Sequence, residues 1–183
     1  MLIAGVDEVG RGCLAGPVVA CAVVLPDGFY DPRIQDSKKV PKKMRQQLYP
    51  YIIDNALTWG IGVVCSRIID KINILNATKQ AMHIAISRLK PCYHKIIIDS
   101  VNLSNLKVPC QHPNKADELY PAVSAASIVA KVYRDNIMEY LASIYPQYGW
   151  EKNAGYGTAA HLQAIRTFGY TPLHRRSFHV KGL

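Results

Sequence analysis

Four short apolar runs lie before Asp99 and give the first indication of a sheet. Each run is too short for a helix of ordinary length, and the run at residues 18–25 is rich in valine and contains no polar residue. Such a run is typical of a strand that is buried on both faces of a sheet. The pattern therefore predicts strands at residues 2–6, 18–25, 57–64 and 96–98.

Helical spacing appears between and after these runs. Within residues 74–89, Leu75, Met82 and Ile86 fall on one helical face. Pro121 suits the first turn of a longer helix, whose apolar positions step by three or four residues as far as Leu141. We expect helices at about residues 42–55, 74–89, 121–145 and 158–167. Together the elements predict an α/β fold, a mixed sheet flanked by helices, with a helical C-terminal extension.

The chain shows no internal repeat, low-complexity tract or long linker. Its 183 residues are enough to bury a substantial core in one domain without disulfide or metal crosslinks. We therefore expect one domain over residues 1–183, with a core at about residues 1–145 and a helical part at about residues 146–183.

The charge balance favours a polyanionic partner. Lys and Arg number 22 against 13 for Asp and Glu, which gives a net charge of +9. Such an excess attracts nucleic acid, although a basic protein can also carry its charge for solubility alone. The bases concentrate in two places, and they predict either two walls of a duplex groove or solvated helix faces. One group is Lys38, Lys39, Lys42, Lys43 and Arg45, and the other is Arg166, Arg175, Arg176 and Lys181.

Cysteine and histidine point away from disulfides and zinc. The five cysteines are scattered, odd in number and never spaced CxxC, which indicates reduced and mostly buried thiols. The six histidines show neither HxH nor HExxH spacing. Asp7 and Glu8 interrupt the N-terminal apolar run before it reaches the length of a signal peptide, and no segment is long enough to span a membrane. These features predict a cytoplasmic protein without a membrane partner.

Acidic residues follow two of the predicted strands. Asp7 and Glu8 end the first, Asp99 ends the fourth, and Asp117 precedes the long helix. If the two strands are neighbours, their carboxylates gather at one edge of the sheet and repel one another unless a cation is present. Ligands that are all oxygen suit Mg²⁺ or Mn²⁺, and two such ions about 3.5–4 Å apart can promote phosphodiester hydrolysis. The alternative is that these acids are solvated or cap helices.

A glycine-rich stretch over residues 10–17 has two interpretations. Gly10, Gly12 and Ala15 satisfy the G-x-G-x-x-A spacing of a dinucleotide-binding loop. Such a loop must open a helix, but Pro17 and the run after it predict a strand, and the preceding acid pair would repel a pyrophosphate. We interpret the stretch as a tight link whose bare backbone lets a phosphate or sugar approach closely, beside Arg11.

These segments together resemble bacterial ribonuclease HII, the type 2 ribonuclease H family, over essentially the whole chain. Residues 4–12 read AGVDEVGRG, residues 14–19 read LAGPVV, and residues 36–39 read DSKK. Further matching blocks are Asp99, KAD at 115–117, YPAVSAASI at 120–128, AKVYRD at 130–135, GYGT at 155–158 and RRSF at 175–178.

The resemblance implies a ribonuclease H-like core and a set of site residues. Asp7, Glu8, Asp99 and Asp117 would be the catalytic acids that bind two Mg²⁺ or Mn²⁺ ions. Gly10, Arg11 and Gly12 would grip the 2′-hydroxyl and phosphate of the substrate, Tyr156 would pack on the ribose, and Lys38 or Lys39 would hold backbone phosphate.

The activity implied by the resemblance is that of a monomeric endonuclease. It would cut the RNA strand of RNA–DNA hybrids, or a duplex 5′ to one embedded ribonucleotide, and leave a 3′-hydroxyl and a 5′-phosphate. The sister type 3 enzymes carry an extra N-terminal domain, whereas the motif here starts at residue 4, which favours type 2. The rivals are a DNA-directed nuclease on the same core, such as a junction resolvase, and a nucleic-acid-binding protein without activity.

Two departures from the family pattern and one neighbouring acid remain. Many relatives have Gly after the third acid, where this chain has Ser100, and many bacterial members read Lys-Gly-Asp where this chain has Ala116 between the lysine and Asp117. Asp135, next to Arg134 in the long helix, predicts a structural Arg–Asp pair rather than a catalytic acid.

Overall fold

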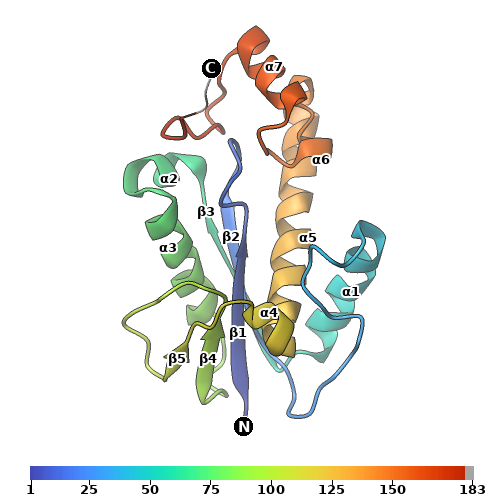
Figure 1. Cartoon of the computed structure of the whole chain (residues 1–183), viewed down its shortest axis with the longest axis vertical. Helices are drawn as coiled ribbons and strands as arrows, with labels where there is room; N and C mark the ends of the chain where they lie inside the picture. The colour runs from blue at the N-terminus through green and yellow to red at the C-terminus, as the bar shows by residue number, and fades with distance from the viewer. Residues whose placement is uncertain (180–183) are drawn as a thin grey trace.

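A computed structural model describes residues 1–179 and shows a five-stranded mixed sheet with helices on both faces (Figure 1). The strand order is β3-β2-β1-β4-β5; β2 runs antiparallel to both β1 and β3, while β4 runs parallel to β1 and β5 runs parallel to β4. This arrangement confirms the predicted fold class. The strands are β1 (Ile3–Val9), β2 (Val18–Val24), β3 (Thr58–Val64), β4 (Lys95–Ile98) and β5 (Cys110–Gln111).

The helices form a layer on each side of the sheet, with α3 on one face and α5, backed by α1, on the other (Figure 1). All four predicted helices are confirmed, and their ends differ from the prediction by two residues or fewer. The pattern did not predict α2, α4, α6 or the two-residue β5. The helical elements are α1 (Lys42–Asn55), α2 (Ser66–Ile72), α3 (Ile74–Ser87), α4 (Ala116–Leu119), α5 (Pro121–Ile144), the 3-10 turn η1 (Pro146–Tyr148), α6 (Trp150–Asn153) and α7 (Ala159–Phe168).

Strand β2 is buried on both faces, as its unbroken apolar run predicted. Because side chains alternate along a strand, one set faces α3 and the other faces α5. Every residue of β2 is fully buried. The set on the α3 side is Val18, Ala20, Ala22 and Val24, and the set on the α5 side is Val19, Cys21 and Val23.

Helix α5 lies very close to β1 because the facing residues are small. A Cβ at Gly5 would overlap the backbone of Ala122 in the first turn of α5. Farther along, Ala125 and Ala126 are fully buried against the same face of the sheet. This close packing fixes the start of α5, and therefore the short helix α4 before it, beside β1.

The residues after α5 fold back over the sheet edge where β1 ends and β2 begins (Figure 1). Tyr148 and Trp150 stack with ring centroids 5.2 Å apart and pack in one cluster with Met138 of α5. The returning chain then pairs with the glycine-rich stretch, where Gly16 N–H donates to the Leu173 carbonyl at 2.9 Å. The C-terminal part therefore covers the glycine-rich stretch. That residues 1–183 form a single domain stays a prediction.

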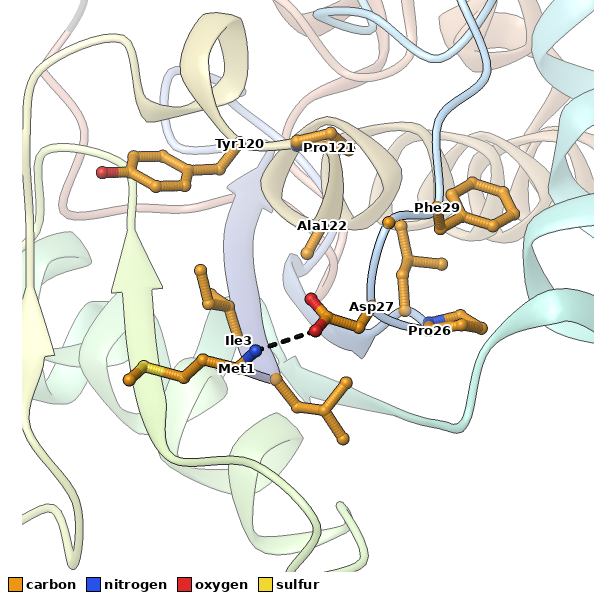
Figure 2. Close-up of a pocket in the computed structure, with 11 residues that line it drawn as sticks. Met1, Ile3, Pro26, Asp27, Phe29, Tyr120, Pro121 and Ala122 are labelled. Carbon is orange, nitrogen blue, oxygen red and sulfur yellow. Dashed lines mark hydrogen bonds and ion pairs between the residues drawn. The ribbon is translucent and has the colours of Figure 1, made fainter.

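A small pocket of about 150 Å³ lies at the start of β1. Figure 2 shows its lining residues, among them Ile3 and Tyr120. Its single acid, Asp27, pairs with the amino group of Met1 at 2.9 Å. Because β1 runs from Ile3 to Val9, this pocket lies at the opposite end of the strand from Asp7. It therefore contributes nothing to the acid cluster.

The five thiols are all unpaired, but they are less buried than predicted. Cys13 and Cys21 are buried, Cys92 and Cys110 are half-buried, and Cys65 is exposed, so the expectation of mostly buried thiols is wrong. Within residues 1–179, none of the helices combines the length and the apolar character that a bilayer span requires.

Candidate active site

Asp7 near the end of β1 and Asp99 directly after β4 meet at one edge of the sheet. The expectation that Asp7 and Glu8 end the first strand is wrong, because β1 continues to Val9 and pairs with β2 that far. Strands β1 and β4 pair in parallel with Val6 opposite Ile98, and the backbone N–H of Asp99 donates to the carbonyl of Val6 at 3.3 Å. Asp7, within β1, and Asp99, which follows β4, therefore lie at the same level of neighbouring strands. The condition that the sequence set for a carboxylate cluster is met.

Helix α4 brings Asp117 to the same edge. The backbone N–H of Ala116 donates to Oδ1 of Asp99 at 3.0 Å, which fixes the start of α4 beside β4. Ser124 of α5 donates its hydroxyl to the carbonyl of Asp117 and holds the helix from the other side. One oxygen of Asp99 therefore accepts a hydrogen bond from the first turn of α4, as a helix-capping acid would. Asp117 is 9% exposed and lines a pocket.

A pocket of about 250 Å³ contains all four predicted acids together with the glycine-rich loop. Lys38 and Tyr156 also line it, whereas Lys39 does not, because its ammonium group pairs with Glu118 at 2.9 Å. The lining residues are Asp7, Glu8, Val9, Gly10, Arg11, Gly12, Ser37, Lys38, Arg45, Asp99, Asp117, Ser127, Lys131 and Tyr156.

Burial and mutual repulsion disfavour negative charge in this pocket. Burial raises the pKa of Asp7 well above its ordinary value, and the neighbouring charge of Glu8 raises it further. Burial also raises the pKa of Glu8, although Arg11, 3.3 Å away, partly offsets the effect. The pKa of Asp117 is raised by burial and then by Asp36 and Asp99. A cation among these groups would favour their charged forms.

The donor set fits a hard divalent cation. Oε2 of Glu8 is buried and accepts no hydrogen bond from any of the residues 1–179, so it has a free lone pair in the pocket that holds three further carboxylates. All of these donors are oxygen atoms, which Mg²⁺ and Mn²⁺ prefer. Among residues 1–179, no three Asp, Glu, His or Cys side chains converge closely enough to hold one ion as they stand. Binding would therefore require small rotations of these carboxylates.

The sequence did not single out two serines and a lysine of the pocket. Ser127 hydrogen-bonds the carboxylate of Asp7, and its hydroxyl oxygen lies 2.9 Å from that of Ser37. Lys131 lies one turn farther along α5 and pairs with Asp135 at 2.7 Å. The signal was present, because Ser127, Lys131 and Asp135 recur every four residues and so share one face of α5.

The structural role expected for Asp135 is present with a different partner. Its carboxylate pairs with Lys131 at 2.7 Å and lies 4.0 Å from Arg45, whereas the adjacent Arg134 points into the protein. Arg45, named above in the basic group, lines the pocket beside Lys131. Arg45 and Lys131 therefore line the pocket of the four acids while both lie close to Asp135.

The prediction that Arg175 belongs to a basic wall of a duplex groove is wrong. Arg175 is only 1% exposed, and its guanidinium donates to the carbonyls of Gly16 and Arg11. It has no surface to offer a duplex, because backbone carbonyls take its donors. Arg166 and Arg176 are exposed, and Lys181 lies outside the described residues.

Tyr156 and the first part of the glycine-rich stretch, Gly10 to Gly12, also line the acid pocket. Tyr156 is 41% exposed, its hydroxyl lies against Cys13, and burial raises the pKa of that hydroxyl. At Gly12 nothing lies within 4 Å of where a Cβ would be, which leaves the bare backbone open as expected. Gly10, with φ of +92°, lacks a Cβ for another reason, because a Cβ there would overlap Arg134.

Comparisons with known proteins agree with one another. A family model described as ribonuclease HII matches residues 4–181. The ribonuclease HII of Pediococcus pentosaceus is 47% identical over 177 residues, which cover 97% of this chain and 69% of that protein. The crystal structure of ribonuclease H2 from Pyrococcus horikoshii superposes with a TM-score of 0.83 at 27% identity, covering 97% of this chain and 94% of that one. The structure of the PCNA:RNase HII complex from Archaeoglobus fulgidus gives 0.80 at 26% identity, covering 99% and 96%.

Proposed function

The chain belongs to the ribonuclease HII family of hydrolases, and on that premise we propose that it is an endonuclease acting on ribonucleotides within duplexes. It cuts the RNA strand of RNA–DNA hybrids and incises 5′ to a single ribonucleotide embedded in DNA, leaving a 3′-hydroxyl and a 5′-phosphate. One observation carries the proposal: four carboxylates share a pocket with a bare-backbone loop and Tyr156.

The proposal assigns metal binding to the four acids Asp7, Glu8, Asp99 and Asp117. When bound, two divalent ions would activate a water and stabilise the leaving oxygen of the phosphodiester. The protein's part is to hold the oxygen donors in place: Ser127 fixes the carboxylate of Asp7, and Ala116 fixes one oxygen of Asp99. The unpartnered oxygen of Glu8 supports this assignment.

Substrate binding is assigned to the opposite side of the pocket. Lys38 presents a cation beside the acids and would hold a phosphate that flanks the cleaved bond, whereas Arg45 and Lys131, which line the same pocket, pair with Asp135. The open backbone at Gly12 would approach the 2′-hydroxyl, and the ring of Tyr156 would pack on the same ribose. Because its five thiols are unpaired, we expect the protein to act in the reducing cytoplasm. We also expect it to act as a monomer.

Cleavage of three end-labelled duplexes tests the proposal: one with a single embedded ribonucleotide, one long RNA–DNA hybrid, and one of DNA alone. We expect both ribonucleotide-containing duplexes to be cut in Mg²⁺ or Mn²⁺ and none in EDTA. Asp7→Asn should abolish the cleavage, while Asp27→Asn, a carboxylate at the other end of β1, should not change it. Equal cleavage of the all-DNA duplex would favour a DNA nuclease, and binding without cleavage would favour a binding protein.

A further inference from the structure

Two arginines are buried at the junction between the glycine-rich stretch and the C-terminal part. Arg134 is 0% exposed and Arg175 is 1% exposed. Within the described part of the chain, neither guanidinium forms an ion pair with a carboxylate. Burying a cation without an anion is costly, so the hydrogen bonds that these two groups make must compensate.

Arg134 ties the glycine-rich stretch to the turn that carries Tyr156. Its guanidinium donates to the carbonyls of Pro17 at 2.8 Å, Ala15 at 3.1 Å and Ala154 at 2.8 Å. The first two acceptors lie in the glycine-rich stretch, and the third precedes Tyr156 by two residues. The planar fork of an arginine can reach all three at once, which a single ammonium group could not.

Arg175 binds the glycine-rich stretch at two residues. Two of its nitrogens donate to the carbonyl of Gly16, at 3.0 and 2.9 Å, and Nη1 donates to the carbonyl of Arg11 at 2.9 Å. Its own backbone N–H donates to Leu14 at 2.8 Å. Burial lowers the pKa of Arg175 to about 10, so the side chain remains a cation at neutral pH.

The bond to Arg11 fixes the direction of the next N–H group. In a planar trans peptide the C=O of one residue and the N–H of the following residue point to opposite sides. Because Arg175 holds the Arg11 carbonyl toward the interior, the N–H of Gly12 must point away from it. No acceptor among the described residues takes that N–H, and Gly12 lines the acid pocket.

We propose that Arg175 and Arg134 are positioning residues for ribose recognition. Arg175 aims the Gly12 N–H into the pocket, and Arg134 keeps the Tyr156 turn in register with that loop. The inference rests on the proposed function, since it assumes that a ribose is read there. Neither side chain touches the substrate.

The first test measures the loop without any substrate. Arg175→Met removes the donors that bind the carbonyls of Gly16 and Arg11. Arg175→Lys keeps the positive charge but lacks the planar, forked guanidinium. Backbone ¹⁵N relaxation should give Gly12 an order parameter of about 0.85 in the wild type and below about 0.6 in both variants. Met82→Ala, in the core between α3 and the sheet, is the matched control for general destabilisation and should leave Gly12 rigid. An unchanged Gly12 order parameter in both arginine variants would overturn the inference.

The second test measures cleavage at a temperature where all variants are folded by circular dichroism. Both Arg175 variants should cut the single-ribonucleotide duplex about tenfold more slowly or worse, the scale of losing one hydrogen bond to a charged or strongly polar group. The loss should appear in kcat, with KM for the duplex close to that of the wild type, because the phosphate-facing cations are intact. Activity equal to that of Met82→Ala would contradict the inference. A wild type that cuts no ribonucleotide would instead refute the proposed function, and the relaxation test would still decide the positioning role.

Discussion

Asp7 and Asp99 lie side by side at one edge of the sheet, on two parallel, hydrogen-bonded strands, and the Asp99 N–H is 3.3 Å from the Val6 carbonyl. The charge of Asp99 adds to the burial and the charge of Glu8 that raise the pKa of Asp7. Without a cation, this arrangement opposes ionisation of the groups that the chemistry requires to be charged. The site is therefore built for a ligand, at the expense of the stability of the unliganded protein.

Replacing Asp7 by Asn should separate activity from stability. We expect kcat to fall about a hundredfold or more, as when a main electrostatic stabiliser is removed. In EDTA at pH 7 the variant should melt at a higher temperature than the wild type, because the raised pKa of Asp7 means that its charged form destabilises the folded state. Cleavage kinetics in Mg²⁺ measure the first effect, and thermal unfolding in EDTA measures the second. A variant that keeps full activity would refute the site assignment.

Lys38 and Lys39 should differ in their effect on duplex binding. Lys38 lines the pocket, whereas Lys39 already pairs with Glu118. Lys38→Ala should therefore weaken binding to RNA-containing and all-DNA duplexes alike. It should also flatten the slope of log affinity against log salt by about 0.9, the value for one lost phosphate contact. Lys39→Ala should change the slope less. Fluorescence anisotropy across a salt series decides between these outcomes, and equal slopes for the two variants would count against the distinction.

Tyr156 should contribute mainly through its ring. Its hydroxyl lies against Cys13, so Tyr156→Phe should be mild, while Tyr156→Ala should lose the platform, worth about 1–3 kcal/mol in nucleic-acid contacts. The defect should be largest on a single embedded ribonucleotide, where no neighbouring 2′-hydroxyl compensates. Cleavage of both substrates and a melting curve are needed together. An unchanged ratio between the substrates, with a lower melting temperature, would mean that Tyr156 only packs.

The sheet and the carboxylate cluster could be predicted, because strand burial and side-chain periodicity are visible in the sequence of each segment. The valine-rich run of β2 predicted two-sided burial, and the acids at two apolar runs predicted a cluster on condition that the two strands were neighbours, although β1 continues past Asp7 to Val9. The short helices α2 and α4 could not be predicted, since one or two turns are too short to establish a period. Arg175 was misassigned because its acceptor on Arg11 lies 164 residues away, so nothing local distinguishes it from a surface base.

The backbone conformation of Ser100, where many relatives have glycine, allows a further prediction. It has φ of 55°, in the left-handed region that favours glycine, directly after Asp99. Ser100→Gly should relieve backbone strain that costs about 1–2 kcal/mol, partly offset by the greater entropy of glycine when unfolded. We expect a net gain of about 0.5 kcal/mol in urea unfolding, with activity retained. A net loss would show that the hydroxyl, 3.2 Å from Oδ1 of Asp99, matters more than the strain.

The buried histidine pair predicts an acid-sensitive C-terminal part. Trp150 donates to Nε2 of His161 at 3.0 Å, and because that nitrogen then accepts, His174 supplies the proton in their 3.1 Å contact. Nδ1 of His174 accepts from the Thr171 N–H at 2.9 Å, and Nδ1 of His161 donates to the Tyr156 carbonyl. Both rings are therefore neutral in the folded protein. A proton added to either one would displace a donor.

Acidification should destabilise the fold through these two rings. Burial lowers the pKa of His161, and burial together with His161 lowers that of His174 to about 4. The unfolded histidines titrate near 6.5, so the stability from keeping them neutral is complete above pH 6.5 and is lost as the pH falls toward 4. His174 alone should lose about 2 kcal/mol of unfolding free energy by pH 5. His174→Gln should remove that part of the loss, whereas His94→Gln, at an exposed histidine, should not. Urea unfolding at pH 7.5 and 5.0 measures the difference, and because Asp7 is present in every variant its opposite contribution cancels. If His174→Gln loses as much stability as the wild type, the pair does not set the acid sensitivity.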